Sequence, residues 1–387
     1  MRVALVTRAY ADTPRLERMA GALAEHGAEV LVVCLRRDDH ERAVEHDGSL
    51  KLVRLRRAKR RGSRLRYAAE YGEFLASALS VVRREAARRP FDLVQVGSPP
   101  DVLLACALPA RLFGAKLVLD VYDLSPELYA SKFAHGRSWP PGSYLLAALE
   151  RAAVASSCHV LCAGEGFRTA LLARGVSPLR VTSIPNSPDE RELDSTLRHH
   201  VVPGQLAYCG SLFDRYGLAT AVQAMPDVAD AVPEAHLDVW GEGPDLERLR
   251  TLSARLGMDG RVRFLGVAPH RDVPRLISNA ACGISTLRSD CFTELAFPAK
   301  LFEYATLGVP IAASRTTPVT RVFSEDAVSF FAPEDFRSYA SAVIRLLLDP
   351  EAARRQAEAA RAEAAPWLWS RWKGRYVALV EHLAGAA

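Results

Sequence analysis

The chain has 387 residues, of which 49% are hydrophobic and 25% charged, and its formal net charge is +5. This composition is typical of a globular protein, and the length is sufficient for two domains of ordinary size. No run of 18 apolar residues is present, so we predict no transmembrane helix. The small positive charge does not indicate a nucleic-acid partner.

The seven cysteines are scattered through the chain without a CxxC pair. We therefore expect reduced cysteines, mostly in the core, and neither a disulfide framework nor a metal site. The N-terminal sequence MRVALVTRAY enters a strand-like run at once and lacks the apolar segment of a signal peptide. These features predict a cytoplasmic protein without a metal or a bound cofactor.

The first half of the chain alternates apolar, strand-like runs with helical patterns. The predicted strands are residues 3–7, 30–34, 52–55, 92–96, 116–121 and 159–162. Continuous apolar strands with helices between them indicate a parallel sheet that is covered on both faces.

A polar, proline-bearing stretch at 185–203 is predicted to be the linker. After it the alternation restarts, with predicted strands at 206–210, 236–241, 261–266, 281–286, 309–314 and 327–331 and final helices at about 334–349, 351–364 and 367–384. The fold class is thus α/β, with two doubly wound, Rossmann-like domains that would bind ligands in the cleft at the carboxyl ends of their sheets. The predicted boundaries are 1–190, completed by about 367–387, a linker at 191–203, and 204–366.

The stretch FPAKLFEYATLG, residues 297–308, carries a lysine and a glutamate three residues apart. Pro298 and Gly308 suit the first turn and the left-handed end of a short helix. Its N-terminus would lie at the carboxyl edge of the sheet, where free N–H groups and Lys300 can bind an anion. Glu303 is placed to accept hydrogen bonds from a ribose diol. An ordinary i,i+3 ion pair on a solvated helix is the alternative.

A second anion site is predicted in LAYCGSLFDRYGLATAV, residues 206–222, which reads as a strand, a glycine-bearing loop and a helix. Gly210 permits close approach of the backbone to a diphosphate, and Arg215 can neutralise its charge. A plain turn between strand and helix is the alternative. A third loop, in residues 239–249, contains Gly241 and is expected to be a structural turn beside the nucleobase.

The order of the motifs YCGSL, GEGP, VRFLG and PAKLFEYATLGVPIAAS resembles the donor domain of retaining glycosyltransferase family 4, which has the GT-B fold. The stretches at 97–104, 117–133 and 184–189 are similar to acceptor-domain motifs of one branch of that family. The resemblance implies a nucleotide-diphosphate sugar, held mainly by the C-terminal domain. It also implies that the last helix, near 367–383, crosses back onto the N-terminal domain.

The resemblance also implies roles for individual residues. Glu303 would hold the ribose hydroxyls, Lys300 and Arg215 the diphosphate, and the backbone at Gly210 would approach the phosphates. The predicted donor-binding residues are Gly210, Ser211, Arg215, Gly241, Lys300, Leu301 and Glu303. The residues predicted to act in catalysis are Asp123, Arg215 and Lys300.

Asp123, at the end of the strand 116–121, would orient hydroxyl groups, although it could equally cap the turn that follows. Glu127 is expected to support that turn. Arg8 and Tyr122 are candidates for acceptor contacts.

Three departures from the family pattern bear on these roles. The first of two glutamates usual in the family falls at Leu295, one residue from Glu294, which becomes the candidate for contacting the donor sugar. The usual lysine of the diphosphate loop is Tyr216, and the usual histidine of the acceptor domain is Tyr122. These losses keep open, as the alternative, a non-catalytic, sugar-nucleotide-binding partner protein or an epimerase of the same fold.

The leading prediction is a hexosyltransferase-type, retaining and metal-independent glycosyltransferase that serves cell-surface polysaccharide or glycolipid synthesis. No strand is followed by GxGxxG, which argues against a dehydrogenase. The segment 54–66 carries eight basic residues and no acid. It predicts peripheral contact with an anionic membrane, and hence a lipid-linked acceptor, although a solvated loop is the alternative.

Overall fold

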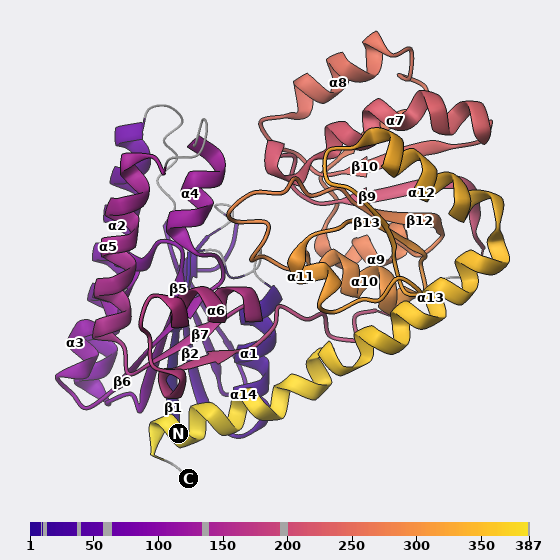
Figure 1. Cartoon of the computed structure of the whole chain (residues 1–387). Helices are drawn as coiled ribbons and strands as arrows, with labels where there is room; N and C mark the ends of the chain where they lie inside the picture. Colours follow the sequence, from indigo (N-terminus) through magenta and orange to yellow (C-terminus); the bar gives the residue numbers. More distant parts are fainter. Residues whose placement is uncertain are drawn as a thin grey trace. The chain divides into compact units, whose positions relative to one another are not determined.

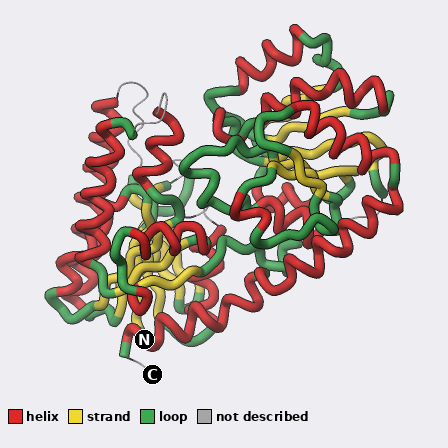
Figure 2. The backbone as a smooth tube through the Cα atoms, viewed as in Figure 1, coloured by secondary structure: helices red, strands yellow, loops and turns green. Residues whose placement is uncertain are grey.

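The computed structural model describes residues 1–8, 10, 14–36, 40–56, 64–133, 139–193 and 200–385. The chain forms two compact units: unit 1 comprises 1–186 and 371–387, and unit 2 comprises 187–370. Each unit is a largely parallel sheet with helices on its faces (Figures 1 and 2). The predicted α/β class is therefore confirmed.

The sheet of unit 1 has the order β3-β4-β2-β1-β5-β6-β7-β8 and is parallel except for β3. Its strands are β1 Arg2–Val6, β2 Glu29–Leu35, β3 Val44–Asp47, β4 Leu50–Leu55, β5 Leu93–Ser98, β6 Lys116–Val121, β7 His159–Cys162 and β8 Val181–Ser183. Its helices are α1 Pro14–Glu25, α2 Arg64–Arg88, the 3-10 helix η1 Asp101–Ala107, α3 Leu108–Arg111, α4 Ser125–Phe133, α5 Pro141–Ser156, α6 Glu165–Ala173, the 3-10 helix η2 Pro178–Arg180 and α14 Trp369–Ala384. The direction of the strand order reverses between β1 and β5, which makes their carboxyl ends the switch point.

A buried polar chain joins α1 and α14 to one face of this sheet. The Arg15 guanidinium pairs with Asp120 of β6 at 2.9 Å, and the Gln95 amide of β5 donates to the same carboxylate at 2.8 Å. The Tyr376 hydroxyl of α14 donates to the Gln95 carbonyl oxygen at 2.8 Å. Because each of these groups is buried and satisfied, the last helix is an integral part of unit 1, as the sequence predicted.

The sheet of unit 2 is fully parallel, in the order β11-β10-β9-β12-β13-β14. Its strands are β9 Val202–Cys209, β10 His236–Trp240, β11 Val262–Gly266, β12 Ala280–Ser285, β13 Ile311–Ser314 and β14 Ser329–Phe331. Its helices are α7 Leu218–Ala231, α8 Leu246–Arg255, α9 Val273–Ile277, α10 Lys300–Leu307, α11 Thr317–Thr320, α12 Phe336–Leu348 and α13 Pro350–Ala364. Here the switch point lies between β9 and β12.

The structure adds elements that the sequence pattern did not predict. Strand β3 is exposed along its whole length and pairs antiparallel with β4, so it has no apolar run to reveal it. Strand β8 has three residues, and β9 starts at Val202, inside the stretch predicted as linker. Two cysteines, Cys158 and Cys291, are exposed rather than in the core.

Candidate functional site

Three loops meet at the carboxyl edge of the unit 2 sheet, around its switch point. They follow β9, β10 and β12. The Gly210 amide donates to the Trp240 carbonyl at 2.9 Å, and the Arg288 amide donates to the Arg215 carbonyl at 3.0 Å. Backbone hydrogen bonds therefore join the loop after β9 to each of its two neighbours.

Glycines make this close approach of the loops possible. A Cβ on Gly241 would lie 1.9 Å from the Gly210 carbonyl oxygen, and a Cβ on Gly217 would lie 1.9 Å from the Thr286 carbonyl oxygen. Both glycines have positive φ, at 150° and 62°. At both glycines a side chain would collide with a neighbouring carbonyl oxygen and would also strain the backbone. The carboxyl edge of the unit 2 sheet is therefore lined here by main chain, which a ligand could approach.

Lys300, the first residue of α10, extends its side chain over this glycine-bearing edge. A Cβ on Gly210 would lie 2.9 Å from the ammonium nitrogen, which is 3.7 Å from the centre of the Tyr208 ring. Among the described residues Lys300 has no hydrogen-bond or ion-pair partner. Burial lowers its pKa to about 8, an effect that Cys209 and Glu303 partly offset. The ammonium is thus charged at neutral pH, poorly hydrated and available to an anion.

Arg215 supplies a second cation on the loop after β9. Its guanidinium lies among three aromatic rings, 4.8 Å from Phe213, 5.2 Å from Tyr216 and 5.7 Å from Phe292. The buried Nε has no hydrogen-bond partner, and no described carboxylate pairs with the guanidinium. Because the Tyr216 ring is also 5.9 Å from the Lys300 ammonium, both cations face the same ring and lie near one another.

The neighbouring Asp214 does not neutralise Arg215. Its carboxylate pairs instead with Arg248 of α8, at 2.9 Å, and with Arg288 of the loop after β12. Arg288 also pairs with Glu334 at 2.9 Å. This network ties three loops and a helix together and leaves the positive charge of Arg215 uncompensated.

Glu303 and Glu294 have different surroundings. Glu303 is half-buried one turn into α10. Burial and, to a smaller extent, the charge of Glu303 raise the pKa of Cys209, the last residue of β9, so the Glu303 carboxylate lies near the end of that strand. Glu294 already accepts hydrogen bonds from the Thr317 amide at 3.0 Å, the Thr317 hydroxyl at 2.7 Å and the Ser289 hydroxyl at 2.7 Å. In this arrangement Glu294 fastens its loop to α11, and a contact with the donor sugar would compete with those bonds.

Two other predicted donor residues, Ser211 and Leu301, make main-chain hydrogen bonds within the protein. Ser211 is exposed, and its carbonyl accepts from the Tyr208 hydroxyl at 2.9 Å. Leu301 is fully buried in the core, and its amide donates to the Pro298 carbonyl at 3.0 Å. Helix α10 begins at Lys300 rather than at Pro298, and it ends at Gly308 with a φ of 71°, as predicted.

In unit 1, the predicted acceptor residues also lie at the carboxyl edge of their sheet. Arg8 follows β1, and its guanidinium stacks 3.7 Å from the centre of the Tyr71 ring of α2. Tyr122 follows β6 and packs on β5, where a Cβ on Gly97 would lie 2.4 Å from the phenol oxygen. Burial raises the pKa of this phenol, so it stays neutral. Asp123 is the next residue and is half-buried.

Sequence reasoning missed a buried acidic cluster beneath this edge. Asp101 accepts hydrogen bonds from the Ser98 and Ser125 hydroxyls, both at 2.6 Å, and so joins the end of β5 to the start of α4. Glu127 of α4 and Glu150 of α5 share one cation, Arg174. Burial raises the pKa of both carboxyls, that of Glu150 to about 7. The partner of Glu127 is thus Arg174 at the end of α6, which sequence reasoning did not anticipate, and its predicted support of the turn at Asp123 stays a prediction.

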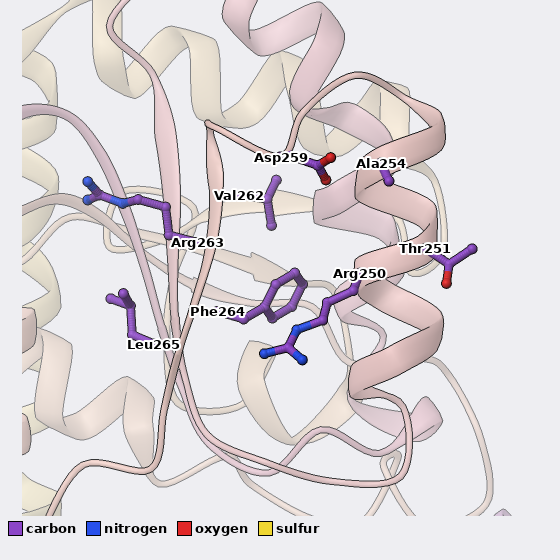
Figure 3. Close-up of a pocket in the computed structure, with 8 residues that line it drawn as sticks. All are labelled: Arg250, Thr251, Ala254, Asp259, Val262, Arg263, Phe264 and Leu265. Atoms are coloured by element: carbon purple, nitrogen blue, oxygen red, sulfur yellow. The ribbon is translucent and has the colours of Figure 1, made fainter.

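One hollow of about 590 Å³ lies away from these residues, between α8 and the edge strand β11 (Figure 3). Its lining includes Arg250, which lies over the Phe264 ring, and none of the predicted donor residues. Within the described parts of the chain, no three potential ligand side chains cluster as a metal site, and no helix is long and apolar enough to cross a bilayer. The basic segment 54–66 falls largely outside the described residues, which omit 57–63.

Comparisons with known proteins agree with this geometry. Residues 191–363 match the family described as glycosyl transferases group 1, and residues 13–187 match the glycosyl transferase 4-like domain. The 2-deoxystreptamine glucosyltransferase of Streptomyces kanamyceticus is 26% identical over 67% of this chain and 71% of that protein. The glycogen synthase of Mycobacterium tuberculosis is 29% identical over 41% of this chain and 37% of that protein.

Solved structures show the same fold at low identity. Sucrose-phosphate synthase from Thermosynechococcus elongatus superposes with a TM-score of 0.82 at 19% identity, over 100% of both chains. Anabaena HepE, solved in complex with UDP and glucose, gives 0.72 at 15% identity, also over 100% of both chains. Both halves of the sequence match glycosyltransferase domains, and the structure consists of two Rossmann-like units. The chain therefore belongs to the group 1 glycosyltransferases, has the GT-B fold and acts as a glycosyltransferase that uses a nucleotide sugar.

Proposed function

We propose that the enzyme transfers a hexose from a nucleoside-diphosphate sugar with retention at the anomeric carbon and without a metal ion. The observation that carries this proposal is the pair of cations, Lys300 and Arg215, at a glycine-bearing loop edge, neither with a carboxylate partner among the described residues. A diphosphate requires charge neutralisation as it leaves, and these two side chains supply it. Metal-bound transferases obtain the same neutralisation from a divalent cation.

This reaction does not require a strong general base from the protein. As the bond between the anomeric carbon and the diphosphate breaks, the leaving phosphate oxygen gains charge and can take the proton of the attacking acceptor hydroxyl on the same face of the sugar. The enzyme then contributes charge stabilisation and placement. Asp123 would orient the hydroxyl groups, and the neutral phenol of Tyr122 replaces the imidazole usual in the family. Loss of that imidazole would slow the reaction without abolishing it.

Glu303 would accept hydrogen bonds from the ribose, and Gly210, Ser211 and Gly241 would contact the nucleotide through their backbone. UDP-glucose is the first donor to test, because HepE was solved with UDP and glucose and a curated relative is a glucosyltransferase. The acceptor would be an intermediate of a cell-surface polysaccharide or a glycolipid.

Three experiments test this proposal. NMR of the product formed from an α-linked donor should show an α linkage, and a β linkage would exclude the retaining mechanism. Activity should persist in chelator, and rescue of a chelated enzyme by manganese would contradict metal independence. Donor binding without turnover on any acceptor tested would favour the alternative of a non-catalytic partner protein, which the departures at Leu295, Tyr216 and Tyr122 keep open.

A further inference from the structure

Lys300 differs from the other half-buried lysines that the structure describes in what stabilises its charge. Those two each pair with a carboxylate: Lys51 with Glu85, at 3.2 Å, and Lys373 with Glu25. The Lys300 ammonium makes no ion pair or hydrogen bond with any described residue. It lies instead over the face of the Tyr208 ring, 3.7 Å from the ring centre. An aromatic ring therefore takes the place that a carboxylate has at the other two lysines.

The Tyr208 ring is held firmly in this position. Tyr208 is 1% exposed and belongs to a buried apolar cluster that includes Leu212. Its hydroxyl donates to the Ser211 carbonyl at 2.9 Å, which fastens the ring to the loop after β9. A Cβ on Gly210 would lie 2.9 Å from the Lys300 nitrogen and 3.6 Å from the Tyr208 hydroxyl oxygen, so the glycine leaves room for both side chains. The ring is thus a fixed surface against which the ammonium packs.

A ring and a carboxylate stabilise a cation in different ways. The negative face of an aromatic ring attracts an ammonium, and the attraction is larger when the ammonium is poorly hydrated. The ring leaves the positive charge in place, whereas a carboxylate neutralises it and would have to be displaced by an entering phosphate. Burial lowers the pKa of Lys300 to about 8, an effect that Cys209 and Glu303 partly offset. An ammonium on a ring can therefore remain charged and open to an anion.

The groups around Lys300 allow its titration to be observed separately. Burial raises the pKa of the Cys209 thiol to about 11 and that of the Tyr208 phenol above its usual value, so both are neutral at pH 8. Glu303 is the nearby carboxylate on the same helix. The Arg215 guanidinium, which stays charged, shares the Tyr216 ring with Lys300, at 5.2 Å and 5.9 Å from its centre. Neither the thiol nor the phenol would titrate with Lys300 near pH 8.

We propose that Tyr208 is a positioning residue for sugar transfer, whose ring face holds the Lys300 ammonium, in place of a carboxylate, where the leaving diphosphate gains charge. The inference rests on the proposed function, in which Lys300 stabilises the diphosphate. Because the ring is buried beneath the ammonium, Tyr208 acts through Lys300 and not by contact with the substrate.

The test changes the charge distribution of the ring and keeps its shape. Tyr208→Phe removes only the hydroxyl, and Tyr208→3,4,5-trifluorophenylalanine, made by codon suppression, also withdraws electrons from the ring face. The chain has six lysines, so carbon-13 NMR of lysine labelled at the ε-carbon gives few signals, and Lys300→Arg identifies the one from Lys300. In the ligand-free protein, Tyr208→Phe should titrate like the wild type. The fluorinated ring should lower the midpoint by about 1 pH unit, and an unchanged midpoint would overturn the proposal.

Tyr339 provides the matched control. It is fully buried in the same apolar cluster, where the Phe331 ring lies edge-on at 5.1 Å, and no described cation lies over it. Tyr339→Phe and Tyr339→3,4,5-trifluorophenylalanine should leave the midpoint of Lys300 unchanged. An equal shift from position 339 would show that fluorination acts through the core in general, which would overturn the proposal.

Calorimetry with UDP separates this inference from the proposed function. The fluorinated ring at 208 should weaken UDP binding about fivefold at pH 8, because fewer Lys300 side chains are charged, and hardly at pH 6. In a Lys300→Met background it should change nothing further, and an additional loss there would overturn the proposal. Wild-type affinity in Lys300→Met would refute the diphosphate contact of the proposed function, and with it the purpose of the ring. Lost affinity in Lys300→Met with an unchanged NMR midpoint in the fluorinated variant would refute the role of the ring alone.

Discussion

In the described part of the chain, charged side chains lack partners at the carboxyl edge of one sheet and have partners beneath the carboxyl edge of the other. In unit 2, Lys300 and Arg215 have no carboxylate partner among the described residues, although Asp214 is the immediate neighbour of Arg215. In unit 1, the acids beneath the edge are matched internally, with Asp101 on two serines and Glu127 and Glu150 on Arg174.

The unpaired cations at the edge of unit 2 indicate a site for a ligand, whereas the paired acids in unit 1 indicate a structural role. Uncompensated cations are costly in a folded protein, so their presence at one edge points to an anion that completes it. Satisfied or protonated acids need no ligand, and those of unit 1 join β5, α4, α5 and the end of α6 to one another. The comparison can be tested by removing one group at a time from each edge.

The largest effect is expected from Arg174→Ala, which leaves two buried carboxyls without their cation. Unit 1 should lose about 3 kcal/mol of unfolding free energy, because breaking a buried ion pair exposes the desolvation cost of the remaining group. Arg168→Ala, in helix α6 just before Arg174, removes only an exposed i,i+3 pair with Glu165 and should cost about 0.5 kcal/mol or less. Urea denaturation measures both, and similar losses would contradict the internal matching of charge in unit 1.

The next effect concerns ligand binding. Lys300→Ala should weaken binding of a nucleoside diphosphate by about 1.5–3 kcal/mol, and Glu303→Gln should do so by a similar amount through the ribose, as for other hydrogen bonds to charged groups. Fold stability should hardly change. Calorimetry of these variants beside Lys116→Ala, an exposed lysine of unit 1, provides the measurement.

The pH dependence sharpens this test. Because the pKa of Lys300 is lowered to about 8, affinity for the diphosphate should fall as the pH rises above 8. Lys300→Arg should abolish that fall, since its guanidinium stays protonated. Wild-type affinity in the alanine variant, or a wild-type affinity independent of pH, would leave the cation without a role in binding.

A smaller effect is expected from the proton held in unit 1. Burial raises the pKa of Glu150 from 4.5 to about 7, so the folded state binds more protons than the unfolded state between these values. The contribution of Glu150 to the unfolding free energy is therefore fully present below pH 4.5 and is lost as the pH rises to about 7. Glu150→Gln should remove this slope, by about 1–2 kcal/mol after allowance for its pairing with Arg174. Denaturation at pH 5, 6, 7 and 8 compares the proteins, and parallel profiles would show that Glu150 does not titrate there.

The smallest effect is expected from Arg288→Ala, which leaves Asp214 paired with Arg248 and so weakens the network that keeps this carboxylate from Arg215. The ion pairs of Arg288 are about half exposed, so the change should be about 0.5–1 kcal/mol, seen as a rise in KM for the donor with little change in kcat. Arg250→Ala, which removes an exposed pair on α8, is the control. An unchanged KM would mean that Arg215 keeps its position without this network.

The order of elements and the donor edge could be predicted because both follow local rules. Apolar strands with helices between them fix a parallel sheet, and loops that leave its carboxyl edge bring Gly210, Gly241 and Lys300 together although they are distant in sequence. Strand β3 could not be predicted because its sequence has no apolar pattern, and it forms a strand through its pairing with β4. The cluster of Glu127, Glu150 and Arg174 depends on how α4, α5 and α6 pack, and no motif spacing encodes that.

Residues 371–387 belong to unit 1, although the whole of unit 2 precedes them in the chain. During synthesis the N-terminal sheet must therefore wait for residues 187–370 to be translated, roughly 10–40 s at bacterial or eukaryotic elongation rates. Throughout that interval the Gln95 carbonyl oxygen lacks the hydrogen bond from the Tyr376 hydroxyl, and the apolar surface that α14 covers in the folded protein stays exposed. The nascent N-terminal unit therefore stays incomplete until α14 has been made, and removal of residues 371–387 should leave it incomplete.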